Sequence, residues 1–250
     1  KQDDGWRQYA KLGLPPHLAK VIHAEDSKIG LRVFILDNSG STASLDGKYI
    51  CEESNGLMYT VPCTRWEEIK RMALEQAEWN VTTGMRCEFV LLNPGPLPLR
   101  EGVDFVHING IAGDEETARQ MCLLHRMLEA VVPHGVTPLV DRVRELHLRV
   151  QNDHASLVAA GQRVILIIAT DGLPTTAHNR VSTFNDKQML TRALRKLMME
   201  LPVSVVVRLC TDDATINDFY SEVESELELA LDVIDDLAGE AREIYRQGNG

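Results

Sequence analysis

The sequence has no long hydrophobic run. Its longest apolar stretches have the length of a strand, well below the roughly 20 residues that a membrane-spanning helix needs. The charged first residues do not lead into the apolar segment of a signal peptide. We therefore expect no membrane insertion and a cytoplasmic location. The chain begins at Lys1 instead of Met, which is typical of a fragment or processed form, so a targeting segment or further domains of the parent protein could precede it.

Basic residues are also in short supply. The chain has 26 Lys and Arg against 37 Asp and Glu, a formal net charge of −11. Proteins that bind nucleic-acid phosphates or anionic membranes select for clustered Lys and Arg. This balance argues against both as the main partner and favours the binding of cations.

The five cysteines are odd in number and form no Cys-x-x-Cys pair. A disulfide scaffold or a zinc ribbon is therefore not expected. Only Cys51 and Cys63 have a plausible route to each other, because an Asn-Gly turn signal lies midway between them in "CEESNGLMYTVPC". The sequence leaves two alternatives for this pair, a disulfide bond or two free thiols.

Apolar runs of strand length alternate with helical patterns along the chain. Three of the runs are almost continuous in Val, Ile and Leu, as in a parallel sheet that is covered on both faces. A shorter, alternating run at Val103–Ile108 follows a loop rich in Pro and Gly, which predicts an antiparallel edge strand. The other predicted strands are Leu31–Leu36, Cys87–Asn93, Arg163–Thr170 and Val203–Cys210.

This alternation predicts an α/β fold with a doubly wound, Rossmann-like and mostly parallel sheet, and with helices on both faces. At 250 residues and 44% hydrophobic content, the chain can bury one large core. We expect an N-terminal extension over residues 1–30, one domain over 31–212, and a helical extension over 213–250 that packs on the domain.

The last segment carries an apolar stripe at helical spacing from Phe219 to Ile244, surrounded by Asp and Glu. The pattern predicts one more helix, acidic on its wet face. It packs either on its own domain or, as a coiled coil or docking site, on a neighbour.

Oxygen-bearing side chains follow the ends of the predicted strands. Asp37, Ser39 and Ser41 come directly after the first strand, in "LDNSGSTA". Asp171 follows a later strand in "ATDGLPTT", and Thr137 stands before the long helix in "HGVTPL". A doubly wound sheet binds its ligands beyond the carboxyl ends of its strands. Two carboxylates and three hydroxyls form an all-oxygen set that suits Mg²⁺, Ca²⁺ or Mn²⁺. Any one of these residues taken alone fits a polar helix cap better, but the five together favour a metal site.

This set, Asp-x-Ser-x-Ser followed by a distant Thr and a distant Thr-Asp-Gly, resembles the metal-ion-dependent adhesion site of von Willebrand factor type A domains. The resemblance runs from about Gly30 to Cys210, and "RWEE", "LLN" and "RLCTDDA" are similar to intracellular eukaryotic members. It implies that five residues hold the cation directly or through water, Mg²⁺ being the first expectation, and that a partner's Asp or Glu completes the octahedron. Those residues are Asp37, Ser39, Ser41, Thr137 and Asp171.

The residues around this set are expected to contact the partner. The predicted rim consists of Asn38, Gly40, Gly135, Gly172 and Leu173. Specificity is also expected from the insertion at Leu45–Pro62 and from Leu173 to His178. The insertion is longer than usual for an α/β connection, and a hairpin beside the site and a solvated loop are equally compatible with it.

The resemblance implies a metal-dependent protein-interaction module, and we expect no enzymatic activity. Two alternatives stay open: a metal-assisted phosphohydrolase that uses Asp37 and Asp171, and an adaptor subunit of an ATPase or a ubiquitin-linked complex. The sequence has no Asp-x-Asp nucleophile pair, phosphate-binding Gly-x-x-x-x-Gly-Lys loop or Gly-x-Ser-x-Gly elbow. We also predict no Lys or Arg beside the metal motifs.

Overall fold

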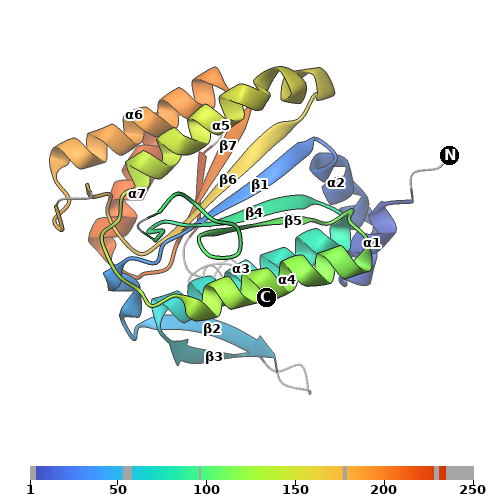
Figure 1. Cartoon of the computed structure of the whole chain (residues 1–250), viewed down its shortest axis with the longest axis horizontal. Coiled ribbons are helices and arrows are strands. Elements are labelled where there is room, and N and C mark those ends of the chain that lie inside the picture. Colours follow the sequence, from blue (N-terminus) through green and yellow to red (C-terminus); the bar gives the residue numbers. More distant parts are fainter. Residues whose placement is uncertain (1–3, 53–57, 96, 177–178, 228–230, 235–250) are drawn as a thin grey trace.

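The computed structural model describes residues 4–52, 58–95, 97–176, 179–227 and 231–234. A six-stranded sheet in the order β5-β4-β1-β6-β7-β8 forms its centre (Figure 1). All neighbouring strands are parallel except β4 and β5. The strands are β1 (Ile29–Leu36), β4 (Arg86–Leu91), β5 (Phe105–Asn109), β6 (Arg163–Thr170), β7 (Val203–Leu209) and β8 (Leu231–Ile234). The predicted doubly wound sheet with one antiparallel edge strand is confirmed.

Helices cover both faces of this sheet (Figure 1). One face packs against α3 (Arg65–Thr83) and α4 (Asp114–Ala130), and the other packs against α5 (Leu139–Ala160), α6 (Phe184–Glu200) and α7 (Ala214–Leu227). Successive side chains of a strand point to opposite faces of the sheet. Because helices cover both faces, the side chains on both faces must be apolar. No helix within the described ranges is both long and apolar enough to span a membrane.

The strand at the centre shows why the predicted apolar runs became buried strands. In β1, Val33 and Ile35 join the core beneath α5, α6 and α7, whereas Phe34 and Leu36 join the core beneath α3 and α4. The Phe34 ring stacks on Phe89 of β4 with 4.7 Å between the ring centroids. Burial on both sides fixes the register of β1, and with it the place where the strand ends.

Two helices precede β1, namely α1 (Trp6–Lys11) and α2 (Pro16–Asp26). The Tyr9 hydroxyl donates a hydrogen bond to Asp26 at 2.8 Å, and Arg32 of β1 forms an ion pair with the same carboxylate at 2.5 Å. Tyr9 and Asp26 are both buried. The helices are therefore tied to the start of the sheet by a buried polar network.

The insertion after β1 forms a two-stranded antiparallel hairpin, which was one of its two predicted forms. Its strands are β2 (Gly47–Glu52) and β3 (Met58–Cys63), and the tip, residues 53–57, lies outside the described residues. Cys51 pairs with Tyr59 and Cys63 pairs with Gly47 across the hairpin. Both thiols are free, which settles the question that the sequence left open.

The prediction of one continuous C-terminal helix is wrong in part. Helix α7 ends at Leu227, and Leu231–Ile234 forms β8, which lies parallel to β7 at the edge of the sheet. The unpaired edge of β7 offers backbone hydrogen bonds, and Leu231 becomes buried against the core there. The remainder of the predicted helix, residues 235–250, lies outside the described residues. Within α7, Phe219, Val223 and Leu227 are buried against their own domain, which is the first of the two predicted alternatives.

Candidate metal centre

The candidate site lies where the chain changes direction within the sheet. From β1 the chain crosses to β4 on one side, and it later returns to β6 on the other side. Asp37 directly follows β1 and Asp171 directly follows β6, and the Asp37 amide donates a hydrogen bond to the Ala169 carbonyl at 2.9 Å. A reversal of strand order between neighbouring strands opens a crevice at their carboxyl ends, and both predicted carboxylates lie there.

The two carboxylates are buried side by side. Asp37 is 0% exposed and Asp171 is 1% exposed. Asp37 Oδ1 accepts a hydrogen bond from the Ser39 amide at 2.9 Å, and Oδ2 accepts one from Thr170 Oγ1 at 2.6 Å. Burial, together with the nearby charge of Asp171, raises the pKa of Asp37 from 3.8 to about 6, and burial also raises the pKa of Asp171. The pair therefore favours a nearby cation or a bound proton.

Two serine hydroxyls connect the ends of β1 and β6. Ser41 Oγ donates a hydrogen bond to Asp171 Oδ1 at 2.9 Å and lies 3.0 Å from Ser39 Oγ. A short 3₁₀ turn, Gly40–Ala43, follows Ser39 and brings Ser41 back over the carboxylates. Four of the five predicted ligands thus lie in one hydrogen-bonded cluster.

The fifth predicted ligand, Thr137, is held beside this cluster. The Thr137 amide donates to Thr175 Oγ1 at 2.8 Å, and the Thr175 amide donates back to the Thr137 carbonyl at 2.9 Å. A methyl group built on Gly172 would lie 3.3 Å from Thr137 Oγ1 and 4.0 Å from Ser41 Oγ. The hydroxyls of Thr137 and Ser41 therefore flank the glycine of the Thr-Asp-Gly loop, where a larger residue would crowd the threonine hydroxyl.

One of the predicted rim residues has a different place. Asn38 is 1% exposed, and its amide forms two hydrogen bonds with the backbone of Asn93. The buried Asn38 side chain therefore links the loop after β1 to the loop after β4, and it does not lie on the surface that was predicted to contact a partner. Gly40 and Gly135 are exposed and joined by a backbone hydrogen bond, and Gly172 and Leu173 are half-buried. Of the last rim segment, Ala177 and His178 lie outside the described residues.

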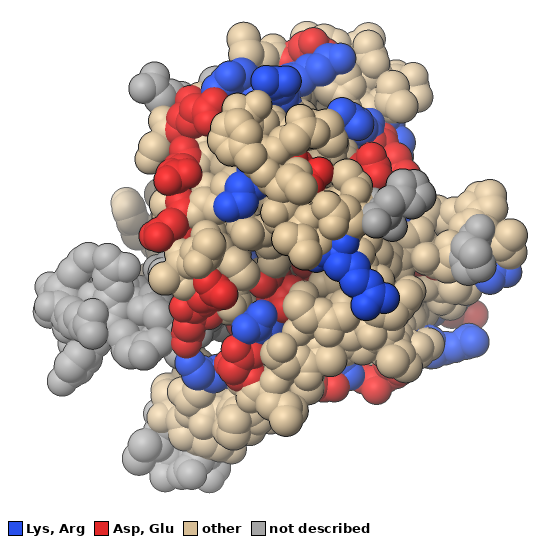
Figure 2. Space-filling model, turned by 90° about the vertical axis from the view of Figure 1, so that its left-hand side faces the viewer, with Lys and Arg blue, Asp and Glu red and all other residues tan. Residues whose placement is uncertain are grey.

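The prediction that no Lys or Arg lies beside the metal motifs is wrong. Arg65, the first residue of α3, donates from Nη1 to Asp171 Oδ2 at 2.9 Å. Its Nε and Nη2 donate to the two carboxylate oxygens of Asp46 at 2.7 and 2.6 Å. Figure 2 shows the molecule from the side at which the strands end, and acidic and basic side chains stand next to each other in the lower half of that view.

The arginine escaped prediction because the hairpin separates it in sequence from the loop after β1. Arg65 follows the hairpin, whereas Asp46 precedes it, and pairing of β2 with β3 brings the two ends together. The sequence feature that could have indicated this contact is a long insertion with a turn motif at its middle. Such an insertion forms a hairpin and brings the residue that follows it close to the residue that precedes it. Thr170, Thr175 and Asn93 were also missed, since they act by holding other site residues.

Comparison with known proteins finds a likeness among solved structures but none among family models or curated sequences. No protein-family model matches the sequence, and no curated protein matches it. Among solved structures, the chain is similar to the VWA domain of SpRpn10, with 9% sequence identity, a TM-score of 0.48, and coverage of 83% of this chain and 87% of that one. A similarity this distant carries no function over to this chain.

The donor atoms of the site define its chemistry. Within the described residues, no group of three or more His, Cys, Asp or Glu side chains could hold a metal ion. The cluster here has two carboxylates, and its other side-chain donors are the hydroxyls of Ser39, Ser41 and Thr137. Such hard oxygen donors suit Mg²⁺, Ca²⁺ or Mn²⁺ and do not suit a soft metal.

Proposed function

We propose that the chain is a metal-dependent protein-interaction module. A divalent cation, with Mg²⁺ as the first expectation, is held by Asp37, Ser39, Ser41, Thr137 and Asp171, and an Asp or Glu side chain of a protein partner binds at the same place. The observation that carries this proposal is the hydrogen-bonded chain from Ser39 through Ser41 to Asp171, beside a second buried carboxylate.

The residues present fit such an ion. Both carboxylates are removed from water, which raises the pKa of each, so a cation that compensates their charge would be stabilised there. The serine and threonine hydroxyls are neutral donors that can turn their lone pairs toward an ion. When bound, the ion would supply an electrophilic point for an anionic group.

Arg65 strengthens the case for an anionic partner. A divalent ion would balance the charges of Asp37 and Asp171, and the guanidinium of Arg65 adds one further positive charge beside Asp171. Asp46 offsets it only partly, because its side chain is 57% exposed and its charge is screened by solvent. The occupied site would thus attract an acidic side chain, although the protein as a whole carries a charge of −11.

A metal-assisted phosphohydrolase is the second candidate, and Arg65 is the observation that favours it. A guanidinium beside a metal is an arrangement that can stabilise a transferring phosphoryl group. However, three N–H groups of Arg65 are already directed at Asp171 and Asp46. An adaptor subunit of an ATPase or a ubiquitin-linked complex would use the same metal-bridged contact, and differs from the first proposal only in its partner.

The test is a comparison of wild type with Thr137→Ala. This change removes one neutral donor and leaves both carboxylates in place. Calorimetry should show weaker Mg²⁺ binding, and proteins captured from an extract by wild type in Mg²⁺ should be lost with the variant and in EDTA. Thr60→Ala, at an exposed position of β3, is the control and should behave as wild type.

The outcome separates the candidates. Undiminished Mg²⁺ binding by Thr137→Ala and Asp37→Ala would overturn the metal site. Partners retained equally in EDTA would overturn the metal-bridged contact. Metal-dependent release of phosphate from a phosphoester substrate would favour the hydrolase instead.

A further inference from the structure

Helix α6 is flanked by a groove on each side. One groove, of about 550 Å³, lies between α5 and α6, and the other, of about 540 Å³, lies between α6 and α7. Both have the size of typical ligand-binding clefts. They differ in their charges, and this difference indicates what each could bind.

The α5–α6 groove combines an apolar floor with a basic rim. Val143 and Met189 lie on its floor, and Leu148 lines it with a side chain that is 63% exposed. Arg144, Arg192 and Lys196 line it as well, and no Asp or Glu is among the described residues that do. Figure 2 shows several Lys and Arg side chains along the top of the molecule, with Asp or Glu side chains among them, where Figure 1 places α5 and α6. This groove therefore carries three positively charged side chains in a chain whose net charge is −11.

The positive charges of this rim are only weakly compensated. Arg144 lies 3.9 Å from Asp141, and Lys196 lies 4.0 Å from Glu200, with every side chain at least half exposed. Exposed pairs at such distances contribute little and are easily exchanged for others. Arg192 forms no ion pair with any residue in the described part of the chain; its Nη2 donates to Gln188 Oε1 at 3.2 Å.

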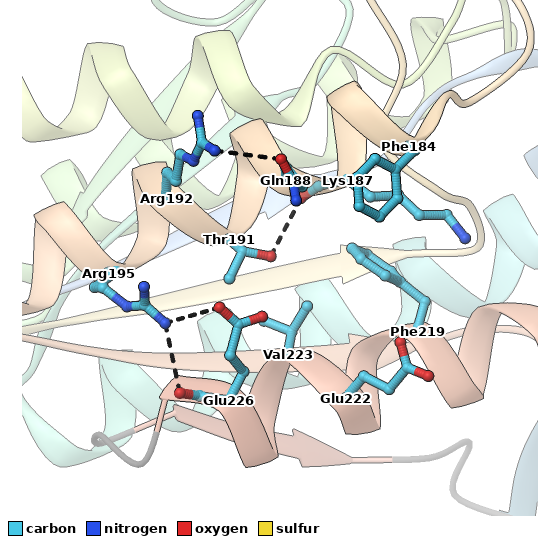
Figure 3. A pocket seen from close by; sticks show the side chains of 10 residues that line it. All are labelled: Phe184, Lys187, Gln188, Thr191, Arg192, Arg195, Phe219, Glu222, Val223 and Glu226. Carbon is cyan, nitrogen blue, oxygen red and sulfur yellow. Dashed lines mark hydrogen bonds and ion pairs between the residues drawn. The ribbon is translucent and has the colours of Figure 1, made fainter.

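The α6–α7 groove, in contrast, is balanced within itself (Figure 3). Arg195 Nη2 donates to Glu226 Oε1 at 2.8 Å, and Glu222 also lines this groove. The Lys187 ammonium lies over the Phe219 ring, 5.1 Å from its centroid. Arg192 is shared by both grooves, and in Figure 3 its guanidinium points away from α7. Unsatisfied positive charge is therefore concentrated on the α5 side of α6.

We propose that the α5–α6 groove binds an acidic amphipathic helix of a protein partner. Aliphatic side chains on one face of such a helix would cover the floor at Val143, Leu148 and Met189. Its Glu or Asp side chains would pair with Arg144, Arg192 and Lys196. A helix that lays its apolar face into a groove between two helices is a common mode of recognition, and charge complementarity selects an acidic one. This site uses none of the metal ligands.

The probe is a fluorescein-labelled helical peptide with Leu at positions i, i+3, i+4 and i+7 and Glu elsewhere. A second peptide carries Lys in place of every Glu. Fluorescence anisotropy in EDTA, which removes any contribution of the metal centre, should show the Glu peptide binding at least about tenfold more tightly than the Lys peptide. Binding should weaken as salt is added. Amide shifts of the wild-type protein in NMR spectra should change along α5 and α6.

Variants then locate the contact. Arg144→Glu combined with Lys196→Glu should weaken binding of the Glu peptide about tenfold, and Leu148→Ser should weaken it several-fold. The matched control, Lys11→Glu combined with Arg126→Glu, makes the same change in net charge at exposed positions of α1 and α4 and should change the affinity by less than about twofold.

Four results would overturn the proposal. They are absence of binding by the Glu peptide, equal affinity for the Lys peptide, an equal loss in the control variant, and shift changes confined to other elements. The wild-type NMR spectra decide the question even if a groove variant fails to fold.

Discussion

The guanidinium of Arg65 lies 2.9 Å from the carboxylate of Asp171, a residue that is 1% exposed and proposed to bind the metal. The same guanidinium holds Asp46, so the base of the β2–β3 hairpin is joined to the candidate metal centre. The protein thus carries a permanent positive charge at the site, and any ion that enters must share Asp171 with it.

Arg65→Gln should therefore tighten Mg²⁺ binding. The change removes the repulsion between the guanidinium and the ion, and frees one oxygen of Asp171. At the effective dielectric of a protein surface, two charges a few ångströms apart interact by a few kcal/mol, and solvent screening leaves an expected gain of about tenfold in affinity. Calorimetry measures it. Asp46→Asn is a control that should have the opposite effect. It removes the negative charge that pairs with Arg65, so the guanidinium repels the ion more strongly and the affinity for Mg²⁺ should fall. Weaker Mg²⁺ binding by Arg65→Gln would contradict this view of the site.

Stability without metal should depend on pH through Asp37. The unfolded chain releases this proton near the ordinary pKa of 3.8, whereas burial raises the pKa of Asp37 in the folded state to about 6. The folded state holds more protons between these values, so the free energy of unfolding should fall as the pH rises from about 4 to 6. Relative to Asp37→Asn, which cannot ionise, wild type should lose roughly 1–3 kcal/mol over this range.

Urea unfolding in EDTA at a series of pH values tests this prediction. Mg²⁺ should restore the lost stability at pH 7 and have little effect near pH 4, where protons compete for the carboxylates. A difference between wild type and Asp37→Asn that does not change with pH would show that Asp37 does not titrate in this way.

Tyr220→Phe should destabilise the loop after β6. The hydroxyl of this fully buried tyrosine on α7 donates a hydrogen bond to the Gly172 carbonyl at 3.1 Å. Its removal leaves a backbone oxygen short of a donor, at an expected cost of about 1–2 kcal/mol. Denaturant unfolding measures this loss. Tyr59→Phe, on the exposed hairpin, should leave stability unchanged; an equally stable Tyr220→Phe would mean that the bond contributes nothing.

Gly47→Ala should separate the hairpin from α3. A methyl group at this position would lie 2.6 Å from the Thr64 carbonyl carbon and 2.7 Å from the Arg65 amide nitrogen, so backbone must move. We expect a loss of about 2 kcal/mol or more, together with weakened Arg65–Asp46 pairing. Gly95→Ala is the control, because its nearest contact would be an ordinary 3.6 Å. Equal melting temperatures of the two variants would contradict the close approach.

The features that were predicted from the sequence are those that depend on a local pattern of residues. Buried strands such as Arg163–Thr170 were predictable because a run of Val, Ile and Leu this long must be covered on both faces. All five proposed ligands were predicted to converge because the carboxyl ends of parallel strands share one edge of the sheet, and four of them lie in one hydrogen-bonded cluster. The fifth, Thr137, lies beside them.

What the sequence did not predict depends on contacts between distant segments. The stretch Leu231–Ile234 fits a helical stripe as well as a strand, and only the open edge of β7 decides between them. Arg65 is brought to Asp171 by the hairpin, and no local pattern signals that contact. The Asn38 side chain faces Asn93 because two loops meet there; from its position beside Asp37 alone, it appeared to belong to the rim.

The two hydrogen bonds of the Asn38 side-chain amide also order the loops of the candidate site before any ion binds. Asn93 extends the connection by donating from Nδ2 to the Val136 carbonyl at 2.7 Å, and the His134 amide donates to the Asn38 carbonyl at 2.9 Å. The loops that carry Asp37 and Thr137 therefore share one set of bonds. Their amide hydrogens should exchange with deuterium only when the domain opens as a whole, so that ordering of these loops accompanies folding and not ligand binding.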